Sequence, residues 1–119
     1  MKNILLIVVL LGLITTSCVQ KSYKKTVVFT VDVSKIKNIK NVGIRGEKPL
    51  DWNYDTEMKM IKKDSIYTIT KTFDTGYKFA EVKFTINGDF ELKDMPNRKV
   101  VFATNGTTTY NAVFDVEKQ

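Results

Sequence analysis

Apolar and polar residues alternate with a period of two along most of the chain after residue 25. Val27, Phe29, Val31 and Val33, for example, alternate with Val28, Thr30 and Asp32, which is typical of a half-buried β-strand. Together with short apolar runs, the pattern predicts eight strands, at residues 26–33, 42–46, 57–62, 66–73, 79–86, 90–92, 99–103 and 108–116. No stretch of ten residues after Cys18 has the periodicity of a helix.

Turn-forming residues separate these segments, at Lys63-Asp64-Ser65, Thr75-Gly76, Asn87-Gly88 and Asn105-Gly106. Both residues of an Asn-Gly pair tolerate a positive φ, so Asn87-Gly88 predicts a type I′ hairpin turn. Short strands at this spacing predict an all-β fold, a single immunoglobulin-like antiparallel β-sandwich over residues 26–117. We expect its interior to contain Val31, Ile69, Phe84, Ile86 and Phe114.

The first eighteen residues have the pattern of an export signal. A short basic start is followed by an apolar run from Ile4 to Ile14, too short for the ~20 residues that cross a bilayer. Ser17 then precedes Cys18, the single cysteine of the chain. This arrangement resembles a bacterial lipobox, in which the cysteine is acylated and becomes the mature N-terminus.

The resemblance implies a signal peptide at residues 1–17 and a tether at residues 18–25. It places the domain in the bacterial cell envelope, on a membrane, in the periplasm or at the surface. An ordinary secretory signal that leaves one thiol is the alternative, although a free thiol is a liability in an oxidising compartment.

Composition excludes several kinds of chemistry. The chain has no histidine, and the lipobox accounts for its one cysteine, so the usual general base and a thiolate metal site are absent. Asp51 and Asp55 could in principle serve a glycosidase or hold calcium, but no long loops form a cleft and no EF-hand spacing is present. We therefore expect a binding protein rather than an enzyme, without a cofactor or a metal.

Lysines dominate the formal net charge of +6 and alternate with apolar residues or lie in turns, as on a solvated face. A nucleic-acid partner conflicts with export. The lysines of residues 21–25 could instead attract anionic headgroups, at about 1 kcal/mol per basic residue near the surface.

Several short motifs occur in a specific order. They are Val42-Gly43-Ile44-Arg45-Gly46, Pro49-Leu50-Asp51-Trp52, Val82-Lys83-Phe84, Phe90-Glu91 and Pro96-Asn97-Arg98. Together they resemble the starch-binding domains (carbohydrate-binding module family 20) and the related glycogen-binding modules, over almost the whole exported part. Phe90 stands where the family usually has its second tryptophan. The resemblance implies a glucan site formed by Trp52, Lys83, Phe90, Glu91 and Asn97.

The chemistry of these side chains suits a sugar ligand. An exposed aromatic ring can cover the apolar face of a glucose ring, while lysine, asparagine and glutamate bond its hydroxyls. Strand alternation directs Lys83 away from the face of Val82 and Phe84. Arg98 we interpret as structural, as a partner of Glu91.

These observations predict a membrane-anchored, non-catalytic module that binds α-glucan (starch, glycogen or maltooligosaccharide) near separate glycoside hydrolases or transporters. The alternative is a structural or protein-interaction lipoprotein that uses the same sandwich without binding sugar, because a fold does not determine a function.

We predict that Cys18 is the acylated N-terminus of the mature protein. Mass spectrometry of protein extracted from membranes should find a lipid-modified Cys18, and Cys18→Ser should release or mislocalise a still-folded domain. An unmodified N-terminus at another residue would contradict the prediction.

Overall fold

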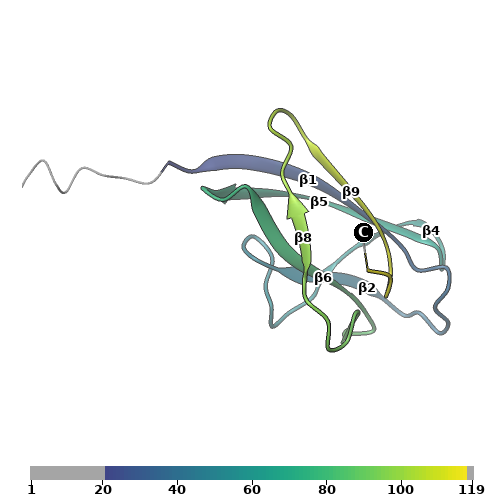
Figure 1. Ribbon diagram of the computed structural model, residues 1–119. Helices are drawn as coiled ribbons and strands as arrows, with labels where there is room; N and C mark the ends of the chain where they lie inside the picture. Colours follow the sequence, from purple (N-terminus) through teal and green to yellow (C-terminus); the bar gives the residue numbers. More distant parts are fainter. Residues whose placement is uncertain (1–20, 118–119) are drawn as a thin grey trace, which may run out of the picture.

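The computed structural model describes residues 21–117, which form nine strands in two facing sheets and no helix (Figure 1). The all-β sandwich expected from the alternation pattern is thus confirmed. The strands are β1 (Tyr23–Asp32), β2 (Val42–Gly46), β3 (Thr56–Glu57), β4 (Lys59–Lys62), β5 (Ile66–Thr75), β6 (Phe79–Ile86), β7 (Asp89–Phe90), β8 (Arg98–Val101) and β9 (Thr108–Val113).

One sheet has the strand order β4-β5-β1-β9, and the other has the order β3-β2-β6-β7 with β8 also paired to β6. The pairing is antiparallel except between β1 and β9, which run parallel from Val27 opposite Thr108 to Asp32 opposite Val113. The expectation of a purely antiparallel sandwich is therefore wrong at this edge. The chain crosses from β8 in one sheet to β9 in the other. There β9 forms the edge of the sheet beside β1 and runs in the same direction as β1.

The segment expected as one strand at residues 57–62 is divided between the two sheets. β3 pairs with β2, whereas β4 pairs with β5. Met58 lies between them, is buried, and donates its backbone N–H to the carbonyl of Val42 at 2.8 Å. Burial of this side chain fixes the point at which the chain changes sheets, and alternation alone does not show such a change.

The first strand begins earlier than expected, because residues 23–25 were assigned to the tether. Tyr23 pairs with Thr75, and the ladder continues to Asp32 opposite Ile66. The long β5 offers partners for these polar residues, so pairing extends the strand beyond its apolar part. Lys25 is fixed further by its ammonium, which donates to the carbonyls of Ala103 and Thr104, both at 3.2 Å.

The core lies between the sheets and is rich in aromatic rings. Phe29 makes edge-to-face contacts with Phe73, Phe84 and Tyr110, at centroid distances of 6.2, 6.4 and 6.1 Å. Of the residues expected inside, Val31, Phe84, Ile86 and Phe114 are buried.

Ile69 was also expected inside but is only partly buried. It lines a groove of about 690 Å³ with Met58 and Tyr67, where the two sheets separate at one side of the sandwich. Alternation predicts the side of the sheet on which a residue lies, but it does not predict how far the facing sheet extends.

The hairpin turn at Asn87-Gly88 has the expected conformation, with φ of 54° and 82°. The Asn87 side chain also accepts from the backbone N–H groups of Lys40 and Asn41, at 2.7 and 3.1 Å, and donates to the carbonyl of Asn38. This turn residue therefore holds the loop before β2 as well as its own hairpin.

We predict that Phe84→Ala lowers the free energy of unfolding by about 3–5 kcal/mol, the usual loss for a truncated core phenylalanine. Phe84 is completely buried and contacts Phe29, so its removal leaves a cavity at the centre of the core. Urea unfolding followed by circular dichroism measures the change. Val101→Ala, at an exposed position of β8, should have little effect, and equal losses in the two variants would contradict the assignment.

Candidate functional site

The outer face of the β2–β6 sheet carries most of the residues expected to bind sugar. Arg45 of β2 lies opposite Lys83 of β6, and Thr85 lies opposite Phe90 of β7. The neighbours Val82 and Phe84 are buried on the inner side, whereas Lys83 is only half-buried. The outward orientation predicted for Lys83 is therefore confirmed, and Phe90 shares its face.

Phe90 presents an exposed aromatic ring within a polar environment. Its side chain is 44% exposed, and the guanidinium carbon of Arg45 lies 4.9 Å from the ring centroid. Asp55 fixes this arginine through an ion pair of 2.6 Å to Nε, and the same carboxylate oxygen accepts from the Thr85 hydroxyl at 3.0 Å. The ring thus has a cation held against it and hydrogen-bonding groups close by.

Trp52 lies in the loop that follows β2 and is half-buried. Buried Leu50 attaches this loop to the core, and the Asp51 carboxylate accepts from the N–H of Asn53 at 2.7 Å in a local turn. Arg45 Nη1 also donates to the carbonyl of Trp52 at 3.3 Å. Arg45 therefore connects the Trp52 loop with the ring of Phe90, so the structure brings the two aromatic residues to one region.

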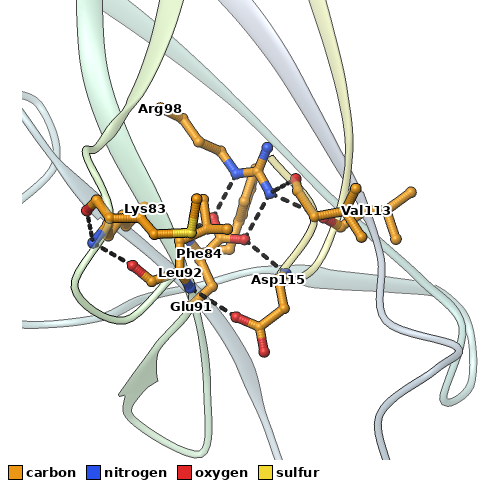
Figure 2. A network of polar contacts seen from close by, with 9 residues as sticks. Lys83, Phe84, Glu91, Leu92, Arg98, Val113 and Asp115 are labelled. Carbon is orange, nitrogen blue, oxygen red and sulfur yellow. Dashed lines mark hydrogen bonds and ion pairs between the residues drawn. The ribbon is translucent and has the colours of Figure 1, made fainter. Parts of the chain in front are cut away.

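Lys83 has a structural role in addition to its position on the face. Its ammonium donates to the carbonyls of Leu92 and Met95, at 3.1 and 2.9 Å, and so holds the loop after β7 against β6 (Figure 2). A lysine ammonium has three N–H donors, so these two bonds do not exhaust its capacity.

Asn97 is exposed at the end of the same loop. Pairing of β8 starts with Arg98 opposite Val82, so the backbone of Asn97 comes level with Lys83. Asn97 also lines a cavity of about 480 Å³ that extends toward Thr109 and Tyr110 at the open side of the sandwich. The residues that line this cavity include neither Phe90 nor Trp52.

Glu91 lies in the interior, contrary to the sugar-contacting role expected for it. Its exposure is 0%, and its carboxylate accepts four hydrogen bonds from within the protein (Figure 2). The donors are the backbone N–H groups of Phe84 and Asp115, at 2.9 and 3.2 Å, and Nε and Nη2 of Arg98, at 2.6 and 2.8 Å. Because Glu91 directly follows the two-residue strand β7, its side chain takes the parity opposite to Phe90 and points inward.

The expected pairing of Arg98 with Glu91 is confirmed. Arg98 is also buried, and its Nη2 donates to the carbonyls of Val113 and Val116 at 2.9 and 2.8 Å. Burial alone would lower the pKa of Arg98. Its hydrogen bonds to Glu91 and Tyr110 and the charge of Glu91 outweigh that effect, so the pKa of Arg98 lies above its ordinary value.

Arg45, Asp55 and Thr85 belong to the face but were not singled out as site residues. Alternation within Val42–Gly46 places Arg45 on the same side as Lys83, so a strand-pairing argument could have identified it. Asp55 reaches Arg45 and Thr85 from the loop before β3, and no spacing in the sequence indicates these contacts.

Comparison with known protein families and with curated protein sequences finds no match for this chain. Within residues 21–117, no helix has the length and apolar character needed to cross a membrane. The same residues contain no cluster of three or more carboxylate, thiol or imidazole groups that could hold a metal ion.

We predict that Glu91→Met destabilises the fold by about 3–5 kcal/mol, because it leaves the buried Arg98 without its counter-charge. Urea unfolding measures the loss. Asp55→Ala, which breaks the partly exposed pair with Arg45, is the control and should cost much less.

The double variant Glu91→Met/Arg98→Met removes both charges and should be more stable than Glu91→Met alone. A double variant less stable than the single one would contradict the view that the unpaired charge causes most of the loss.

Proposed function

We propose that this protein is a non-catalytic module that binds α-glucan on the outer face of the β2–β6 sheet and is held at a membrane by an acylated Cys18. The observation that carries the proposal is the exposed ring of Phe90, with a cation against it and Trp52 in the connected loop. A glucose ring has C–H groups on its faces and hydroxyls at its edge, so it needs this combination of aromatic and polar groups.

Each side chain has a specific role in this proposal. Phe90 and Trp52 stack on sugar rings. Arg45 lies against the Phe90 ring and holds the Trp52 loop through its backbone carbonyl. Lys83 donates to a hydroxyl with its remaining N–H, and Asn97 both donates and accepts. Glu91 supports the site from the inner side of the sheet, where it bonds Phe84 of β6 and Arg98 of β8.

The surface is open, so we expect modest affinity, with a Kd in the micromolar to millimolar range, or roughly −8 to −4 kcal/mol. Several modules on one polymer would bind more tightly through effective concentration. A membrane anchor gathers several modules on one surface, where they can bind the same polymer. It also keeps the polymer near separate hydrolases or transporters of the envelope.

We predict that Trp52→Ala and Phe90→Ala each lose at least about 2 kcal/mol of binding, the usual cost of truncating an aromatic anchor. Phe90→Trp should hold or improve affinity, because it provides a larger platform. Isothermal titration calorimetry with maltoheptaose measures all three variants. In the parent protein, fluorescence of the single tryptophan adds an independent measurement.

Tyr77→Ala is the matched control, since Tyr77 is an exposed aromatic residue in the β5–β6 turn and should leave the Kd unchanged. If folded parent protein shows no heat, no fluorescence change and no retention on insoluble starch, glucan binding is excluded. The structural or protein-interaction lipoprotein then becomes the better interpretation.

A further inference from the structure

One end of the sandwich combines exposed aromatic rings with an excess of lysines. We define this tether end as residues 21–26, 72–81 and 99–107. The strand pairing brings these segments together, because Tyr23 lies opposite Thr75 and Phe79 lies opposite Val101. The β8–β9 loop joins them through Lys25, which bonds the carbonyls of Ala103 and Thr104. In Figure 1 the start of β1 and the β5–β6 turn lie at the left.

Three large apolar side chains are exposed at the tether end. Tyr77 is 74% exposed, Val101 is 63% exposed and Tyr23 is 57% exposed. The ring of Tyr77 is 6.4 Å from that of Phe79, and the Lys99 ammonium lies 4.2 Å from the Phe79 centroid. Tyrosine prefers a boundary between apolar and aqueous phases, since one end of its side chain is apolar and the other is polar.

The charge of the tether end is positive. Its lysines are Lys21, Lys24, Lys25, Lys78 and Lys99, and its carboxylates are Asp74 and Glu81. Asp74 lies opposite Lys24 and Glu81 lies opposite Lys99 in the strand pairing. The charges of Lys21, Lys25 and Lys78 therefore have no opposing carboxylate in the pairing at this end.

We propose that the tether end docks on the headgroup region of an anionic lipid bilayer. This inference rests on the lipid anchor in the proposed function. Tyr23 is five residues after Cys18, so an extended chain allows at most about 18 Å between the anchor and the start of β1. Such a short connection keeps the basic end at high effective concentration near the membrane, and weak contacts of about 1 kcal/mol per lysine then suffice.

Docking in this orientation keeps the candidate sugar face accessible. Phe90 lies opposite Thr85, six residues along β6 from Phe79 at the tether end, so at about 3.3 Å per residue it is roughly 20 Å from the docked end. The Trp52 loop starts nearer that end, where Glu47 bonds the carbonyl of Glu81, but Arg45 holds the Trp52 carbonyl at the level of Lys83, four residues from Phe79. The membrane therefore contacts one end of the sandwich, and a polymer can reach the outer face of β2, β6 and β7.

The test uses the full mature protein reconstituted into vesicles of phosphatidylcholine alone or of phosphatidylcholine mixed with the anionic lipid phosphatidylglycerol. Flotation of the vesicles reports anchoring, and amide hydrogen exchange reports docking. Peptides from residues 72–81 should exchange several-fold more slowly on the anionic vesicles, and peptides from the β4–β5 turn should not change. High salt should abolish the difference.

Lys21→Ala/Lys78→Ala should reduce the docking equilibrium about 25-fold, because each lysine near an anionic surface contributes about five-fold. Lys62→Ala/Lys63→Ala removes the same charge from the opposite end of β5 and should behave as the parent protein. Tyr77→Ser should also reduce protection while flotation is retained.

A parent protein that floats but exchanges equally on both kinds of vesicle overturns the docking surface alone. Failure to float, with Cys18 unmodified, overturns the anchor and the docking with it. Calorimetry with maltoheptaose in detergent reports glucan binding separately from both.

Discussion

The buried ion pair between Glu91 and Arg98 connects parts of the sandwich that backbone ladders do not join. Glu91 accepts from the backbone of β6 and of the segment after β9, and Arg98 donates to the carbonyls of Val113, at the end of β9, and of Val116. Two charges are expensive to bury unless each is paired and hydrogen-bonded, and here the carboxylate has four donors. The pair therefore links the two ends of the β7–β8 connection to each other and to the chain around the end of β9.

The outer face of the β2–β6 sheet depends on this interior arrangement. Glu91 directly follows Phe90, so anchoring the glutamate inward leaves the aromatic ring no choice but the outer side. Lys83 holds the carbonyls of Leu92 and Met95 over the same strand, and Arg45 lies against Phe90. The segments around the exposed ring are thus fixed by strand pairing, by the Arg45–Asp55 ion pair and by the hydrogen bonds of Lys83, and the proposed binding role requires such preorganisation.

Alternation predicted the sheets well because it reports directly on which side of a strand is buried. It placed Phe84 inside and Lys83 outside, while the Asn87-Gly88 pair separately indicated the hairpin turn. It could not show that Met58 divides one apolar run between two sheets, since that depends on which partner strand lies nearby. It did not by itself show that Glu91 is buried. The pairing with Arg98, seven residues away, was expected, but the Asp115 N–H that also bonds the carboxylate comes from a segment 24 residues away.

The two proposed surfaces, the outer face of the β2–β6 sheet and the tether end, need different environments and lie in different parts of the fold. A sugar platform needs one face of its ring open to water, whereas an aromatic residue near a lipid surface gains by leaving water. Placing Tyr23 and Tyr77 at the end where the chain enters the domain, and Phe90 near the other end of β6, separates these environments along one strand. Since β6 contributes to both, its length sets how far a bound polymer would lie from the bilayer. In the proposed arrangement, a strand shorter than the eight residues of β6 would bring the platform closer to the headgroups.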